Sequence, residues 1–241
     1  MRQLKKSCPL AVTAYLFLHS LSCSPSHAEV IVHDLVVRAN EEVMLKAETT
    51  GRFFRKGGEQ VTFLVEGKTV GKTLSGGDGF AYQSFVTRKT GLLKITARSA
   101  HEEGSGLLLS LKRGKGIVFV DVEGTLLKGR FSDEPREGSR NAVAVISRKL
   151  PVVYLRTGLL STSVLKAWLK DHHFPELPVV PWDQGRVFDM ISEKGFTIRA
   201  LVAGPDVIES SNKYKPTAFS FEETEDSEEV KDWQEIRKKL R

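Results

Sequence analysis

Cysteine is nearly absent from this chain of 241 residues, and both cysteines, Cys8 and Cys23, lie close to the N-terminus. Around them a positively charged start precedes an uncharged apolar stretch, Leu10 to Leu18, and Ser26-His27-Ala28 supplies small residues for a cleavage site. This layout is typical of a secretory signal peptide over residues 1–28, and it predicts cleavage after Ala28 and a periplasmic or secreted location. Cleavage would remove both cysteines, which excludes disulfides and thiol chemistry from the exported protein.

Long apolar runs are also missing. A membrane-spanning helix needs about 20 apolar residues, and the stretch from Leu10 to Leu18 is shorter. A retained membrane anchor is one alternative to cleavage. Lipidation at Cys23 is another, and we disfavour it because Leu21 stands one position too close to the cysteine for a good lipobox.

A strong charge imbalance is lacking too. The formal net charge of the whole chain is +6, and residues 1–28 contribute three basic residues and no acid. The exported part therefore keeps only a small positive excess. An excess of this size does not predict binding to nucleic acid.

Residues 29–112 consist of short segments with strand-like alternation, separated by glycine-rich turns. In Gln60–Val65, for example, Val61, Phe63 and Val65 fall on one face. Regular short strands without helical spacing predict an all-β sandwich. The segment resembles bacterial Ig-like modules of exported proteins, and the stretches that carry the resemblance are Gly57–Phe63, Glu66–Gly71, Asp78–Ala81 and Gly91–Ile95. The resemblance implies a spacer or adhesion platform, with a protein partner held through this domain.

After a basic, glycine-rich link at 112–116 the pattern changes. Continuous apolar runs such as Ile117–Val120 alternate with segments of helical spacing such as Ser161–Asp171. Strands buried on both faces and alternating with helices predict an α/β doubly wound, Rossmann-like domain over residues 113–221. Residues 222–241 begin acidic and end basic, which predicts a charged C-terminal helix or tail.

The candidate chemistry lies where the first of these strands ends. Asp121 and Glu123 are two residues apart, so both carboxylates point the same way at the carboxyl end of the strand. Ligands of open α/β sheets bind at that end. Two carboxylates there can hold a hard cation such as Mg²⁺, while Gly124 and Thr125 could contact an anion.

This stretch resembles the first motif of the haloacid-dehalogenase (HAD) superfamily, in which the first acid is a nucleophile that forms an aspartyl-phosphate. The resemblance implies Asp121 as nucleophile, Glu123 as general acid and base, and Thr157 with Gly158 as phosphate contacts after the second strand. It implies Arg186 in place of the family's lysine. The metal ligands implied are Asp121, Glu123, Asp206 and Glu209. Glu123 and Pro205 stand where the family carries aspartate, which departs from its pattern.

Within that superfamily the segment from Ile117 to Phe221 resembles the C-terminal domain of lipin-type phosphatidate phosphatases and of large phosphatidylinositol-transfer proteins. The stretches that carry this likeness are Tyr154–Gly158, Val164–Leu169, His172–Pro175 and Asp183–Gly185. It implies a phosphorylated small molecule or an anionic lipid as ligand, with association at a membrane surface.

Three functions follow from these patterns. The first is an exported, Mg²⁺-dependent phosphomonoester phosphatase of HAD type, acting on a substrate such as phosphatidate. The second is an inactive HAD-like module that binds an anionic lipid or phosphate ligand. The third is an Ig-like adhesion or assembly protein, in which the sandwich carries the biological role.

Overall fold

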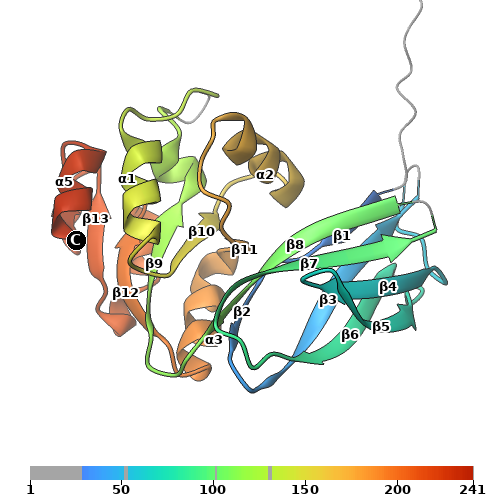
Figure 1. Cartoon of the computed structure of the whole chain (residues 1–241). Coiled ribbons are helices and arrows are strands. Elements are labelled where there is room, and N and C mark those ends of the chain that lie inside the picture. Colours follow the sequence, from blue (N-terminus) through green and yellow to red (C-terminus); the bar gives the residue numbers. More distant parts are fainter. Residues whose placement is uncertain (1–28, 52–53, 101, 130–131, 241) are drawn as a thin grey trace, which may run out of the picture.

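The structure, a computed structural model, describes residues 29–51, 54–100, 102–129 and 132–240. The expected leader, including Cys8 and Cys23, lies outside the described residues. Figure 1 shows an all-β half beside a half in which strands and helices alternate. In the described part of the chain, no helix is both long and apolar enough to span a bilayer.

Two sheets make up the all-β half. Their strands are β1 (Glu29–Val32), β2 (Leu35–Arg38), β3 (Glu42–Thr50), β4 (Gln60–Val65), β5 (Lys68–Leu74), β6 (Phe80–Val86), β7 (Gly91–Ser99) and β8 (Glu102–Leu111). Among the described residues, one sheet has the order β1-β3-β6 and the other the order β2-β8-β7-β4-β5. The predicted sandwich is confirmed, although β5 was not anticipated as a strand.

Alternation explains why these strands form a sandwich. Successive side chains of a strand point to opposite faces, so every second residue of β3 and β4 enters the layer between the two sheets. Leu45, Ala47, Val61 and Phe63 are fully buried there, within one apolar cluster. The other face of the β1-β3-β6 sheet faces outward, whereas Val36, Leu109 and Leu111 on the other face of the second sheet are buried.

The second half is built on a parallel sheet. Its elements are β9 (Gly116–Asp121), a π-helical turn (Val122–Leu126), α1 (Ser139–Ser147), β10 (Val152–Arg156), α2 (Thr162–Asp171), β11 (Val179–Pro181), a 3-10 turn (Asp183–Gly185), α3 (Arg186–Glu193), β12 (Thr197–Val202), α4 (Pro205–Glu209), a second 3-10 turn (Asn212–Tyr214), β13 (Thr217–Ser220), β14 (Glu228–Glu229) and α5 (Trp233–Lys239). The described strands pair in the order β11-β10-β9-β12-β13-β14, and every pair is parallel.

The two faces of this sheet are covered differently. Helices α1, α2 and α5 pack on one face, in a cluster that includes Val143, Leu165 and Trp233. Helices α3 and α4 pack on the other, through residues such as Phe188 and Ile208. On that second face the cluster also takes in residues of the sandwich, namely Val36, Leu109 and Leu111. The two halves therefore share this second hydrophobic cluster.

This junction corrects the predicted fold class, a sandwich followed by a doubly wound domain of HAD type. In a doubly wound domain, helices cover both faces of the sheet. Here the described residues contain more strand than helix. On the second face of the sheet, strands β2 and β8 of the sandwich pack beside α3 and the short α4. The parallel sheet is present, and the apolar cluster on one of its faces includes residues of the sandwich.

The C-terminal segment ends in a charged helix that also has a buried side. Helix α5 is charged along its exposed side, yet Trp233 and Ile236 are fully buried against the sheet. The Trp233 indole N–H donates to the carbonyl oxygen of Thr125 at 3.2 Å. The terminal helix is thus part of the core beneath the end of β9.

Candidate functional site

The predicted acids lie where β9 ends and the chain turns sharply. Every residue of β9 after Gly116 is buried, because the strand has a neighbour on each side and apolar layers above and below. Asp121 pairs in register with Leu155 of β10, so Thr157, two residues further on, follows at the same edge of the sheet. The structure therefore brings Asp121, Glu123, Thr157 and Gly158 together, as the sequence predicts.

Asp121 is enclosed. Its residue is 2% exposed, and its Oδ1 accepts hydrogen bonds from the Gly124 N–H at 3.0 Å and the Thr157 hydroxyl at 2.6 Å. The Gly204 N–H lies 3.5 Å from Oδ2. Burial raises the pKa of Asp121 above its ordinary value, although these hydrogen bonds oppose the shift.

Glu123 turns back onto the loop after β10. Its Oε2 accepts from the backbone N–H groups of Thr157 at 2.8 Å and Gly158 at 2.5 Å, and its Oε1 accepts from Leu160 N–H at 3.2 Å. A Cβ at position 158 would lie 2.4 Å from Oε1, so glycine is required for this approach. The carboxylate of Glu123 thus occupies the amide cradle that was predicted to contact a phosphate.

The remaining predicted residues lie apart from this cluster or serve the backbone. The Thr125 hydroxyl donates to the Asp121 carbonyl at 2.5 Å, so it points into the turn. Arg186 has an exposed side chain, and its charged neighbour is Asp183, at 4.0 Å. Asp206 and Glu209, on α4, are exposed.

The four predicted Mg²⁺ ligands are not gathered into one group. Within the described residues, no group of three or more histidine, cysteine or acidic side chains is placed to hold a metal ion. The four carboxylate oxygens of Asp121 and Glu123 each already accept at least one hydrogen bond from the chain itself. The arrangement fastens the end of β9 to the loop after β10.

A buried carboxylate that the sequence analysis missed lies at the junction of the two halves. The Asp34 side chain is fully buried; Oδ1 accepts from Leu107 N–H at 2.8 Å and pairs with Lys166 Nζ at 2.6 Å. Its Oδ2 accepts from Val179 N–H at 2.8 Å. Burial raises the pKa of Asp34, and Lys166 opposes that shift. An acid within the apolar segment 30–37 was the only sequence signal for this role.

A second missed feature is the outward surface of the β1-β3-β6 sheet. Directly paired residues of an antiparallel sheet share a face, and Lys46 pairs with Tyr82 while Glu48 pairs with Phe80. The surface formed by Met44, Lys46, Arg55, Phe80 and Tyr82 is called the aromatic–cationic face below. Met44 on β3 is 49% exposed, and Tyr82 on the edge strand β6 is 44% exposed.

Contacts between charges and rings order this face. Lys46 Nζ lies 3.9 Å from the centroid of the Phe80 ring, and Arg55 Cζ lies 4.5 Å from it. The rings of Phe80 and Tyr82 have centroids 6.3 Å apart. Cations over aromatic rings contribute roughly 0.5–1 kcal/mol at exposed sites.

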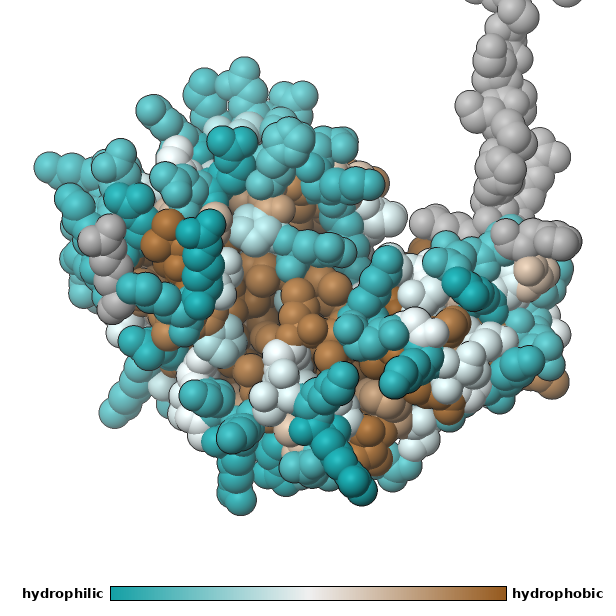
Figure 2. Space-filling view, in the orientation of Figure 1, coloured by the Kyte–Doolittle hydropathy of each residue, from teal (hydrophilic) through white to brown (hydrophobic). Residues whose placement is uncertain are grey.

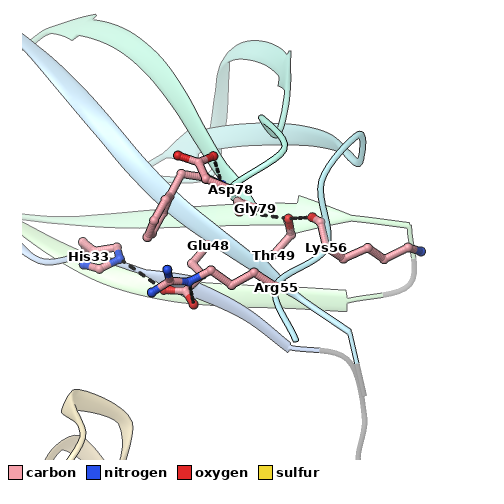
Figure 3. A network of polar contacts seen from close by, with 8 residues as sticks. His33, Glu48, Thr49, Arg55, Lys56, Asp78 and Gly79 are labelled. Atoms are coloured by element: carbon pink, nitrogen blue, oxygen red, sulfur yellow. Dashed lines mark hydrogen bonds and ion pairs between the residues drawn. The ribbon is translucent and has the colours of Figure 1, made fainter. Parts of the chain in front are cut away.

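Hydrogen bonds hold the Arg55 side chain and the segment that carries it in place, as Figure 3 shows. The Arg55 Nε donates to Glu48 Oε1 at 2.6 Å, and His33 Nε2 lies 4.0 Å from the other oxygen of Glu48. The Thr49 hydroxyl is 2.5 Å from the Lys56 carbonyl and 3.1 Å from the Gly79 carbonyl. The segment that carries Arg55 is thereby tied to β3 and to the turn before β6.

Comparisons with known proteins give no family assignment. No family model matches the chain, and no curated protein matches it. Similar solved structures include the D0-D1 domain of intimin, with 13% identity, 38% of this chain and 56% of that chain covered, and a TM-score of 0.30. A CARDB domain from Pyrococcus furiosus has 14% identity, 35% and 92% coverage and a TM-score of 0.28. Fibronectin(III)-like modules from Clostridium thermocellum have 16% identity, 34% and 99% coverage and a TM-score of 0.24. The match spans about half of the intimin fragment.

These findings correct the resemblance drawn from the motifs. The similar structures are Ig-like, fibronectin type III and CARDB β-sandwich domains, and no family model supports a HAD-like, lipin-like or phosphatase assignment. The catalytic roles predicted for Asp121, Glu123, Thr157 and Arg186 depended on that assignment. In the structure both carboxylates accept hydrogen bonds from neighbouring loops of the fold.

Proposed function

We propose that this chain is an exported adhesion or assembly protein that holds a protein partner on its aromatic–cationic face. One observation carries the proposal: Met44 and Tyr82 are exposed beside a ring that two cations and a neighbouring aromatic already hold in place. Tyrosine, methionine and arginine are enriched where proteins bind one another.

The order of the face supports binding because it lowers the entropic cost of association. A side chain immobilised on binding costs about 0.5–1.5 kcal/mol. Lys46 and Arg55 are already positioned over Phe80, and Arg55 is fastened through Glu48. A partner that covers Tyr82 would desolvate these contacts and strengthen them, since cation–aromatic attraction rises when water is excluded.

The rest of the fold supplies a rigid mount for this face. The sandwich is attached to the parallel sheet by a shared core and by the buried Asp34, so the two halves resist relative motion. In this proposal the leader places the interaction outside the cytoplasm, and the carboxylate cluster at the end of β9 is a structural fastening.

Site-specific photo-crosslinking tests the proposal in the cells that produce the protein. A photoreactive phenylalanine at position 82 is expected to yield a discrete adduct of higher mass, because that position lies in the covered interface. The matched control is the same residue at position 209, an exposed position on α4. A charge placed beside the site, Met44→Glu, should remove the adduct at position 82. Absence of an adduct, or identical adducts at positions 82 and 209, would refute the proposal.

A further inference from the structure

A basic groove lies between the sandwich and α2, away from the aromatic–cationic face. It has a volume of about 640 Å³, and its walls come from β7, β8, α2 and the segment that leads into β11. This volume falls within the range of about 300–1,000 Å³ that is usual for binding pockets. Lys94, Lys166, Lys170 and His173 line the groove, with Glu176 as the acid among its lining residues.

Two of these cations are unpaired. Lys166 is committed to Asp34, whereas the side chains of Lys94 and Lys170 are exposed and make no ion pair with any described residue. In Figure 1, α2 stands over the side of the sandwich formed by β7 and β8. A groove that presents free ammonium groups from both walls suits an acidic occupant.

An acidic segment of fitting character lies on the same chain. Residues 222–229, Glu-Glu-Thr-Glu-Asp-Ser-Glu-Glu, contain six acids within eight residues. Glu228 pairs with Lys239 and Asp226 accepts from Asn212, while Glu222, Glu223 and Glu225 are exposed and have no ion-pair partner among the described residues. The segment is held in shape by the Ser220 and Thr224 hydroxyls, which accept from Glu222 N–H and Asp226 N–H.

The groove and the acidic segment cannot meet within one molecule. The segment ends at β14, one edge of the six-stranded parallel sheet, while the groove borders β11, the opposite edge. Two copies can bring them together. A contact between different surfaces of two identical chains is heterologous, and it repeats from copy to copy unless rotation closes a ring.

We propose that the chain self-associates head to tail, with residues 222–229 of one copy seated in the groove between the sandwich and α2 of the next. Complementary charge sets the orientation of this contact and accelerates the encounter. The acidic segment is preorganised and the groove is part of the junction fixed by Asp34, so neither side needs to fold on binding. This contact uses none of the residues of the aromatic–cationic face.

Charge reversal on each side gives a test with an internal rescue. The full chain, expressed with its own leader, is examined by sedimentation velocity at 50 mM and 500 mM salt. The two variants are Lys94→Glu with Lys170→Glu, and Glu223→Lys with Glu225→Lys. Each variant alone should associate at least about ten-fold more weakly, because the first makes the groove acidic and the second reduces the net charge of the segment from −6 to −2. An equimolar mixture should regain association as pairs, since the unaltered groove of one variant fits the unaltered segment of the other.

A matched control separates this contact from general charge effects. Lys68→Glu with Lys72→Glu changes the net charge by the same amount on β5, outside the groove, and should leave association unchanged. Association should weaken strongly in high salt, where the screening length falls to a few ångströms. A chain that stays monomeric at both salt concentrations, or a mixture that shows no rescue, overturns the proposal. Crosslinking at position 82 is scored separately, so either proposal can fail without the other.

Discussion

The carboxylate of Asp34 should stabilise the whole molecule, because it joins the two halves from a fully buried position. In Asp34→Ala, the N–H groups of Leu107 and Val179 lose their acceptor. A buried donor left without a partner costs about 1–3 kcal/mol. The Lys166 ammonium loses its partner too, although its side chain is 29% exposed and can turn towards water.

An opposing contribution reduces this cost. Burial disfavours the charged form of Asp34, which is why its pKa is raised. Removing the carboxylate therefore recovers part of its desolvation energy. We expect Asp34→Ala to lower the free energy of unfolding by roughly 2–4 kcal/mol. A loss of this size is a substantial fraction of the 5–15 kcal/mol that is typical of folded proteins.

Urea unfolding followed by far-UV circular dichroism measures the change. Glu176→Ala is the matched control, because it removes an exposed carboxylate from the same junction and should shift stability by less than about 0.5 kcal/mol. Lys166→Met leaves the Asp34 charge buried without its cation, so it should be destabilising on its own. The double variant should cost less than the sum of the two single changes. If the free energy of unfolding of Asp34→Ala lies within 0.5 kcal/mol of that of the unaltered chain, the proposed role of Asp34 at this junction is wrong.

Three further predictions concern other residues, all measured by urea unfolding. Burial lowers the pKa of His33 below 6.5, so the unfolded chain binds the proton more readily and stability is lost as the pH falls below about 6.5. His33→Phe should therefore reduce the difference in the free energy of unfolding between pH 7.5 and pH 5.5, and an unchanged difference would contradict this. Gly158→Ala should cost about 0.5–1.5 kcal/mol, the net contribution of a hydrogen bond, because its Cβ would displace the Glu123 carboxylate from exposed donors. Gly204→Ala, where a Cβ meets nothing within 4 Å, should cost less, and equal effects would count against the fastening role. Trp233→Ala should cost about 3–5 kcal/mol through the cavity it creates, and Trp233→Phe much less, since it loses mainly one hydrogen bond; similar losses would refute the cavity argument.

Local pattern was sufficient to predict most strands and helices. The alternation in Gln60–Val65 and the continuous apolar run of β9 reflect burial on one face and on two faces, and each pattern has a single structural solution. Strand β5 was missed because its residues, from Lys68 to Leu74, are mostly exposed and carry no burial signal. Burial of Trp233 in the predicted charged helix or tail was missed, because one aromatic residue among many charges does not reveal what it packs against.

The candidate site shows where sequence reasoning stops. Register along neighbouring parallel strands could be inferred, and it correctly placed Thr157 beside Asp121. The orientation of Glu123 could not, because it depends on backbone N–H groups of a loop that follows another strand. Asp34 was equally invisible, since its partners lie 73, 132 and 145 residues away in the chain.

Paired acids at the end of a buried strand therefore admit two physical explanations, which differ in the hydrogen bonds that the acids accept. A carboxylate that performs chemistry must keep lone pairs free for a metal, a proton or a substrate. A carboxylate that closes a turn uses them on backbone donors, which would otherwise remain unsatisfied where the strand ends. Asp121 and Glu123 accept through all four of their oxygens, from donors on three segments that follow β9, β10 and β12. Their chemical identity suggested reactivity, and the six hydrogen bonds that they accept join the ends of three parallel strands.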